Sequence, residues 1–466
     1  MAAKHLRGWS RDRAGQMPGA VQAVLEQLLR LSFLVFCCFV FFLVAFPAYG
    51  ELKIGGSPNL APSRLLRLAM LGLMLLVLMI KPFRQSLTHQ NERDARLLFW
   101  LVAAFWMWVL PLVLFHAASF GYTLSKLRNE VVPVWISFWL AVVLVRRPSQ
   151  VDSLVNVLAW SAIVLLGVMG VEVVLRRNVF DGLLQVENIS TQLAFLEDLR
   201  DGFYRAKGTF QHPLVLAHFL VSFGLLFLAK GLFHPKPLGA GAKWSLLGGI
   251  CLSCVYFTNT RSGLAIGVVF GVLLLSLRYL VWLRGFANQV MAMMLRLQLM
   301  WLPILAAGGA YVLADLMAGR SAAERSSSSS RLLTLVNAFD NIGESPLIGF
   351  GVGLGDTKGG TSYAGGYMYT VDNLFLLQTL DNGIPAALLL FACFVYCAWR
   401  ITPRWTDWSP CEDVGLRVGL LFLMLTTAAM YFIYALSDLF ELCFVLIGAT
   451  LCLPGRRGLG RGAISS

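Results

Sequence analysis

The chain has 466 residues, of which 58% are hydrophobic and 14% are charged, and its formal net charge is +13. Its apolar runs repeatedly reach the ~20 residues that an α-helix needs to cross a hydrocarbon core of ~30 Å. This composition excludes a separate soluble domain and predicts an integral membrane protein. The basic residues are spread over many short loops, which argues against a nucleic-acid-binding protein.

Twelve apolar segments follow one another along the chain, so we predict an all-α, polytopic membrane protein. The first segment comes after a basic stretch and has no small-residue cleavage site behind it. We therefore expect a retained helix and not a removed signal peptide. The predicted spans are 28–46, 65–80, 97–115, 131–145, 154–175, 213–233, 244–259, 262–283, 293–314, 374–399, 416–434 and 436–453.

The basic residues predict the orientation of these spans. With the N-terminus in the cytoplasm, lysines and arginines collect in alternate loops, as the positive-inside rule requires, and both termini are cytoplasmic. The predicted divisions are a cytoplasmic tail (1–27), spans 1–5 (28–175), an outer loop (176–212), spans 6–9 (213–314), a large outer loop with an amphipathic helix (315–371), spans 10–12 (372–453) and a cytoplasmic tail (454–466).

The two outer loops are too long to be simple connectors, since most connections have ~4–6 residues and longer ones tend to be functional. The first loop ends in RAKGTFQHP, which contains Arg205, Lys207, Gly208 and His212. The glycine and the proline at the helix start predict a defined entry into the sixth span. His212 is a candidate base or phosphate ligand, and the alternative is a structural role.

Two further arginines stand at predicted helix starts. Arg261 lies in the first turn of the eighth span, in TNTRSGLAIG, and Arg331 opens the amphipathic helix in SSSSSRLLTLVNAFDNIGESP. A cation at that end opposes the helix macrodipole and costs ~0.3–1 kcal/mol unless an anion compensates it. A bound anion would remove the conflict, whereas the alternative for Arg261 is a side chain that reaches the lipid headgroups. Thr334, Ala338 and Asn341 share the face of Arg331, so this face is expected to point toward a cavity.

The stretch PLIGFGVGLGD follows that helix and contains Gly351 and Gly353. No strand precedes it, so it is not a dinucleotide-binding fingerprint, and we expect its glycines to permit a close backbone turn. Asp372 and Asn373 then stand at the mouth of the tenth span, and Asp381 follows about two turns below them.

Several arginines at one membrane face are typical of a phosphate or pyrophosphate clamp, because the guanidinium group is permanently charged and presents a planar fork of donors. We therefore predict a transferase with a lipid-diphosphate donor, in which Arg205, Arg261 and Arg331 stabilise the departing pyrophosphate. Asp372 is the candidate general base for the acceptor hydroxyl, and the alternative is a cap on the tenth helix. No His, Asp and Glu cluster has metal-ligand spacing, so neither a metal nor another cofactor is expected. The candidate substrate-binding residues are Lys207, His212, Asn373, Gly351 and Gly353.

The order of these motifs resembles the family of bacterial O-antigen ligases and Wzy-type O-antigen or exopolysaccharide polymerases. RxKGTFxHP, TxTRSGL, an arginine-led helix ending in ESPLIGFGVG, and DNLFLLQTLDNGIPAALLL follow one another over about residues 200–400. The resemblance implies a GT-C-like glycosyltransferase of the bacterial inner membrane whose long loops face the periplasm. It also implies an undecaprenyl-diphosphate-linked glycan as donor, without metal or nucleotide sugar. A chain-length regulator and a flippase are the protein partners that it suggests.

One residue departs from the family pattern, because Asp372 stands where many members, ligases especially, have a histidine before the asparagine. A carboxylate can also act as a base, so this departure favours an exopolysaccharide polymerase over an O-antigen ligase.

Three other interpretations remain open from the residues alone. Twelve spans also suit a polysaccharide exporter or a lipid-linked glycan flippase, although the clustered arginines favour an enzyme. A peptidoglycan glycosyltransferase fits the ordered motifs poorly. Finally, Glu172, Asp438 and Glu441 fall within or near predicted spans, and each is a further candidate for binding the acceptor.

Overall fold

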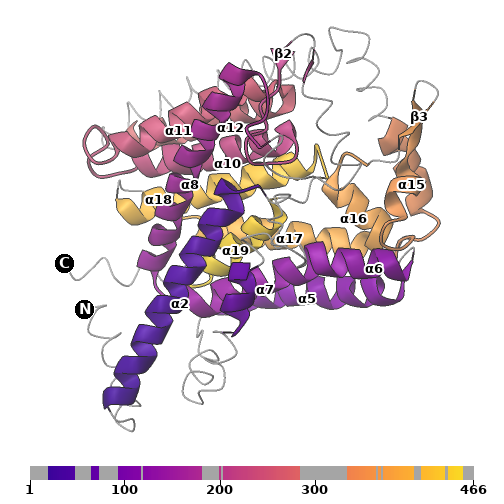
Figure 1. The fold of residues 1–466 in the computed structure, drawn as a ribbon, viewed down its shortest axis with the longest axis horizontal. Helices are drawn as coiled ribbons and strands as arrows, with labels where there is room; N and C mark the ends of the chain where they lie inside the picture. The colour runs from indigo at the N-terminus through magenta and orange to yellow at the C-terminus, as the bar shows by residue number, and fades with distance from the viewer. Residues whose placement is uncertain are drawn as a thin grey trace.

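The computed structural model is predominantly helical, with two short β-hairpins (Figure 1). It describes residues 19–47, 65–72, 93–116, 119–180, 199–200, 203–283, 333–363, 366–368, 371–403, 411–435 and 439–454.

The described helices are packed side by side (Figure 1). In chain order, they are α2 (Gly19–Ala45), α5 (Arg93–Phe115), α6 (Phe120–Lys126), the π-helix η1 (Leu127–Val131), α7 (Val132–Leu144), α8 (Pro148–Leu175), α10 (Pro213–Leu232), α11 (Ala242–Cys254), the 3-10 helix η2 (Val255–Thr258), α12 (Arg261–Leu283), α15 (Gly355–Gly359), α16 (Leu374–Asn382), α17 (Ile384–Ile401), α18 (Glu412–Tyr431) and α19 (Phe440–Thr450). Residues 65–72 and 333–342 are also helical. The hairpins pair β1 (Leu199–Arg200) with β2 (Phe203–Tyr204) and β3 (Thr361–Tyr363) with β4 (Gly366–Met368), both antiparallel.

Within the described ranges, 7 helices are long and apolar enough to cross a membrane. They are Glu26–Ala45, Asp94–Phe115, Pro148–Leu175, Pro213–Leu232, Arg261–Trp282, Ile384–Ile401 and Glu412–Tyr431. The chain is therefore a polytopic, helical membrane protein. The expected span 293–314 lies outside the described residues and 65–80 is described only as far as residue 72, so the number twelve stays a prediction.

The tenth predicted span, 374–399, is not one helix. It consists of α16 and α17, which meet at Gly383. Gly383 has a φ of 82° and a ψ of 167°, a conformation that is essentially restricted to glycine. A Cβ atom at this position would overlap the carbonyl oxygen of Leu347. Hydropathy missed the break because both helices are apolar, whereas the local sequence Gly383–Ile384–Pro385 carries the usual end and start signals of two helices.

Helix α10 forms the centre of the packing and is almost completely buried. It packs against α11, α12 and α18 (Figure 1). Small residues allow these close approaches: a Cβ on Gly248 of α11 would meet the backbone of Leu228, and one on Gly419 of α18 would meet the backbone of Leu226. The N-terminal end of α10 therefore has a fixed position, and this end follows the first arginine motif.

Buried arginines close the opposite end of the bundle. Arg400 is 1% exposed and donates hydrogen bonds to the carbonyl oxygens of Thr450, Leu451 and Leu453 at the end of α19. Arg417 is 0% exposed and donates to the carbonyl of Pro454. Carbonyl groups at a helix C-terminus lack intrahelical partners, so these cations cap α19.

Candidate functional site

Two of the arginine motifs meet in the structure. The N–H of Ala206 donates to the carbonyl of Phe257 at 3.0 Å, and Nε of Arg205 donates to the carbonyl of Thr258 at 3.4 Å. Arg261 begins α12 three residues after Thr258. The structure therefore brings together the backbone segments of Arg205 and Arg261, which come from different parts of the sequence.

A buried carboxylate at the end of α8 holds the first of these segments. Oε1 of Glu172 accepts hydrogen bonds from the hydroxyl of Tyr204 (2.7 Å), the N–H of Lys207 (3.2 Å) and the side-chain amide of Asn178 (3.2 Å). Its Oε2 accepts from the N–H of Gly208 at 2.6 Å. Four donors therefore tie the carboxylate of Glu172 to this loop, and binding of the acceptor by Glu172 stays a prediction.

Lys207 and His212, the candidate substrate-binding residues of this loop, also have defined positions. Lys207 is 0% exposed, and its charge lies close enough to act on the carboxylate of Glu172. His212 is the N-cap of α10, where its Nδ1 accepts a hydrogen bond from the N–H of Leu214 at 3.1 Å. This cap gives His212 the structural role that the sequence left as an alternative. Substrate binding by Lys207 and His212 stays a prediction.

The glycine-rich stretch makes the close backbone turn that the sequence predicts. Gly351 and Gly353 have φ angles of 102° and 90°. The N–H of Gly351 donates to the carbonyl of Asp381 at 3.1 Å, and the N–H of Val352 donates to the carbonyl of His116 at 3.0 Å. A Cβ on Gly351 would lie 2.5 Å from the His116 carbonyl oxygen, so only glycine fits there. The loop is thereby wedged between the ends of α5 and α16.

The carboxylate of Asp381 anchors the same loop from the other side. Its Oδ1 accepts hydrogen bonds from the N–H groups of Gly353 at 3.1 Å and Gly355 at 2.9 Å, and the residue is 3% exposed. The neighbouring carbonyl of Asn382 accepts a hydrogen bond from the indole of Trp108 at 3.0 Å. The glycine-rich loop and the junction of α16 and α17 are therefore one connected unit.

Asp372 stands between two anchored neighbours. The N–H of Val371 donates to Oδ1 of Asp356 at 2.9 Å. On the other side, Oδ1 of Asn373 accepts from the N–H of Leu376 at 3.0 Å and caps α16. The helix cap is thus Asn373, so the capping alternative for Asp372 is wrong. Binding of substrate by Asn373 stays a prediction.

Charged side chains gather around Asp356, and we call Asp356, Asp372, Lys126 and Glu130 the Asp356 cluster. Burial raises the pKa of the Asp356 carboxyl, and the charges of Asp372 and Glu130 act in the same direction. The N–H of Val371 and the charge of Lys126 oppose this shift in pKa. Lys126 and Glu130 form an ion pair of 2.7 Å across the start of the π-helix η1. Single π-helical turns are frequent at functional sites.

Of the Asp356 cluster, the sequence predicted a role only for Asp372. Asp356 ends the glycine-rich motif and was available as a signal, but Lys126 and Glu130 precede the fourth predicted span and resemble ordinary loop charges. Among the described residues, no His, Cys, Asp and Glu side chains are grouped as ligands of a metal ion.

The described part of the arginine-led helix, residues 333–342, buries the face of Thr334 and Ala338, whereas a cavity at this face stays a prediction. Thr334 and Ala338 are 6% and 0% exposed, and Ala338 packs with Val371 next to Asp372. Phe339 on the opposite face is 65% exposed. The face that carries Thr334 and Ala338 therefore points to the segment that carries Asp372. Arg331 itself lies outside the described residues.

Two further acidic residues, Glu441 and Asp438, were candidates for binding the acceptor. Glu441 forms an ion pair with Arg67 at 2.8 Å and is 9% exposed, so it joins two helices. Asp438 lies outside the described residues.

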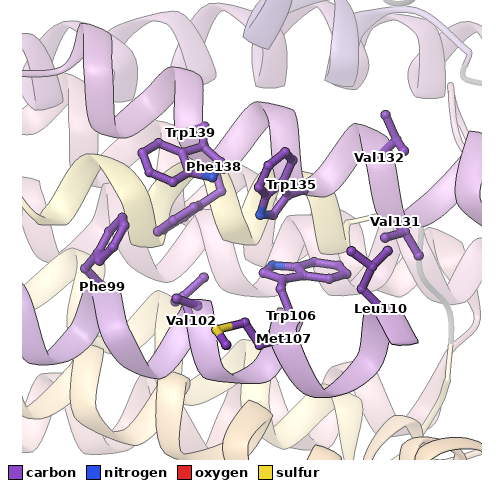
Figure 2. A pocket seen from close by; sticks show the side chains of 11 residues that line it. Phe99, Val102, Trp106, Met107, Leu110, Val131, Val132, Trp135, Phe138 and Trp139 are labelled. Atoms are coloured by element: carbon purple, nitrogen blue, oxygen red, sulfur yellow. The ribbon is translucent and has the colours of Figure 1, made fainter. Parts of the chain in front are cut away.

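An apolar groove of about 310 Å³ runs between α5 and α7 (Figure 2). Figure 2 shows tryptophan rings from both helices facing each other across it. It reaches η1 at Val131 and therefore ends near the Asp356 cluster. The lining residues are Phe99, Val102, Ala103, Trp106, Met107, Leu110, Val131, Val132, Trp135, Phe138 and Trp139.

These features define a polytopic membrane protein with arginine and carboxylate groups on two anchored loops. Residues 246–391 match the family model described as O-antigen ligase (Wzy_C). This part of the chain is therefore similar to the O-antigen ligase domain, which confirms the resemblance to the O-antigen ligase and Wzy-type family, and that family implies glycosyl transfer. The match includes Arg261, Gly351, Gly353 and Asp372, whereas Arg205 lies before it. No curated protein matches the chain.

Proposed function

We propose that this protein polymerises lipid-diphosphate-linked oligosaccharide repeat units at the periplasmic face of the bacterial inner membrane. The observation that carries the proposal is the pairing of the Arg205 and Arg261 segments within a chain whose O-antigen ligase domain also holds Asp372. Arginines on two paired segments suit a diphosphate, and a carboxylate at a helix mouth suits an acceptor hydroxyl.

The proposed reaction is a single displacement at the anomeric carbon of the donor sugar. The acceptor hydroxyl attacks this carbon, and Asp372 takes the hydroxyl proton. The bond between the anomeric carbon and the diphosphate oxygen breaks, so that undecaprenyl diphosphate leaves with the electron pair. Arg205, Arg261 and Arg331 balance the charge that grows on this leaving group.

The groove between α5 and α7 supports a lipid-linked donor. Its lining is apolar and it reaches Val131 of η1, which follows Glu130 of the Asp356 cluster in the chain. A polyprenyl chain that lies along this groove would have its diphosphate end near the charged residues. The charge on Lys126 would then meet the diphosphate with the favourable sign.

A second candidate function is the transfer of a finished glycan to lipid A-core, as an O-antigen ligase does. The description of the matching family favours it, whereas the carboxylate at Asp372 favours polymerisation. Purified protein in nanodiscs, supplied with lipid-linked repeat units alone, separates the two. A ladder of longer lipid-linked chains supports the polymerase. Product that appears only after lipid A-core is added supports the ligase, and translocation of the lipid without a new glycosidic bond would show a flippase.

Arginine variants test the clamp. Changing Arg205, Arg261 or Arg331 to alanine should abolish transfer at normal protein abundance, and lysine should rescue poorly because it lacks the bidentate fork. Arg177, which is exposed at the end of α8, is the matched control, and its alanine variant should keep full activity. Full activity in two of the three clamp variants would refute the clamp.

A further inference from the structure

Glu172 is an unusual residue for its position. It lies in the last turn of the membrane helix α8 and is 0% exposed. A charged side chain within a membrane helix costs ~2.5–3.5 kcal/mol on insertion scales and is retained mainly where it has a function. The structure indicates what this function is, because every contact of the carboxylate leads to the loop that follows α8 or to the segment at Arg205.

Both oxygen atoms of Glu172 are needed as acceptors. Oε1 receives three donors and Oε2 receives the N–H of Gly208 at 2.6 Å. A glutamine at this position has the same shape but must place an NH₂ group opposite at least one of these donors. It would leave a buried N–H without an acceptor, so the substitution breaks the anchor without creating a cavity.

The residues whose N–H groups bind Glu172 follow closely after Arg205 in the chain. The N–H groups of Lys207 and Gly208 bind Glu172, and the N–H of Ala206 binds the carbonyl of Phe257 on the other side. Arg205 is therefore the first residue of a segment that is held between α8 and η2. Asn178 strengthens this arrangement, because its amide bridges Glu172 and the carbonyl of Gly208 at 3.2 and 3.1 Å.

We propose that Glu172 is a positioning residue for the transfer reaction, and that its carboxylate fixes the segment that presents Arg205 to the lipid diphosphate. The inference rests on the proposed role of Arg205. The charge of Lys207 beside the carboxylate offsets its negative charge, so Glu172 can stand near a diphosphate site without repelling the donor.

The test is a double-mutant cycle on binding of undecaprenyl diphosphate to the full-length protein in nanodiscs. Glu172→Gln should weaken binding about 10- to 100-fold, the range expected for one lost hydrogen bond to a charged group. In the Arg205→Ala background, the same change should have no further effect, because Glu172 acts through Arg205. Glu26→Gln, which changes an exposed carboxylate of α2, should leave binding unchanged.

Hydrogen exchange provides a readout that does not depend on the proposed function. The amides of Lys207 and Gly208 should exchange slowly in the wild type and at least about 10-fold faster in Glu172→Gln. If the exchange is unchanged, or if binding falls equally in both backgrounds, the inference is overturned. If exchange rises while Arg205→Ala leaves binding unaltered, the anchor is real and the role of Arg205 in the proposed function fails. Should Glu172→Gln not accumulate, Asn178→Ala removes one donor and the bridge, and it should show the same pattern with a smaller change.

Discussion

The two loops that carry the predicted site residues are anchored in a similar way, but they should differ in their response to substitution. In each, a buried carboxylate near a helix end accepts N–H groups from a glycine-containing loop. Glu172 uses both oxygens, at 2.6 Å to Gly208 and 3.2 Å to Lys207, and adds side-chain donors. Asp381 uses Oδ1 alone, at 3.1 Å to Gly353 and 2.9 Å to Gly355. We therefore expect that an amide side chain can take over the anchoring role of Asp381, which uses one oxygen, but not that of Glu172, which uses both.

The loops also differ in how much they depend on glycine. Among the described residues of the first loop, one glycine has a positive φ, Gly208 at 60°. The described residues of the second loop and of the junction of α16 and α17 include four such glycines. They are Gly349, Gly351, Gly353 and Gly383. The second loop is therefore held mainly by backbone conformation, and the first mainly by the side chain of Glu172.

The largest effect is expected at the helix junction. Gly383→Ala must adopt a φ of 82° and overlaps the carbonyl of Leu347, so it should destabilise the protein by more than about 3 kcal/mol. The measurement is the yield and the unfolding temperature in detergent. Gly249→Ala in α11 is the control, because nothing lies within 4 Å of its new Cβ and it should be neutral. Equal behaviour of the two variants would contradict the role of backbone conformation.

The second prediction concerns the two carboxylates that hold the loops, Asp381 and Glu172. Asp381→Ala leaves two amide N–H groups without their acceptor and should cost about 2–4 kcal/mol. Asp381→Asn keeps Oδ1 in place, so it should cost less than about 1 kcal/mol. Unfolding temperatures of both variants, with Glu172→Gln alongside them, give the comparison. If the asparagine variant is as unstable as the alanine variant, the second carboxylate has a role beyond accepting these two bonds.

The smallest effect is expected at the cap of α16. Asn373→Ala should lower the stability by about 0.5–2 kcal/mol, whereas Asn373→Asp retains a good cap and should be nearly neutral. The unfolding temperature measures both. A loss of glycan transfer in Asn373→Asp, at unchanged stability, would instead support the predicted substrate contact.

The sequence predicted the elements of the site better than their arrangement. The sequence assigned Arg205 and Arg261 to one predicted clamp, and the structure brings their backbone segments together. Helical periodicity assigned Thr334 and Ala338 to one face, and both are buried. The anchoring role of Glu172 could not be predicted, because sequence spacing does not show which loop amides reach a helix side chain. The break at Gly383 was missed since a hydropathy average does not register backbone conformation. Asp356 was missed because its contact with Val371 depends on the fold of the intervening hairpin.

The central claim is that Asp372 is the base for transfer from a lipid-diphosphate donor. Since Asn373 provides the cap of α16, Asp372→Asn leaves that cap intact and tests the chemistry alone. The measurement is the turnover of lipid-linked repeat units by purified protein, together with binding of undecaprenyl diphosphate. The account predicts a fall in turnover of about 10²- to 10⁴-fold, the usual contribution of a general base, with binding unchanged. Wild-type turnover in Asp372→Asn would contradict it and remove this carboxylate from the mechanism.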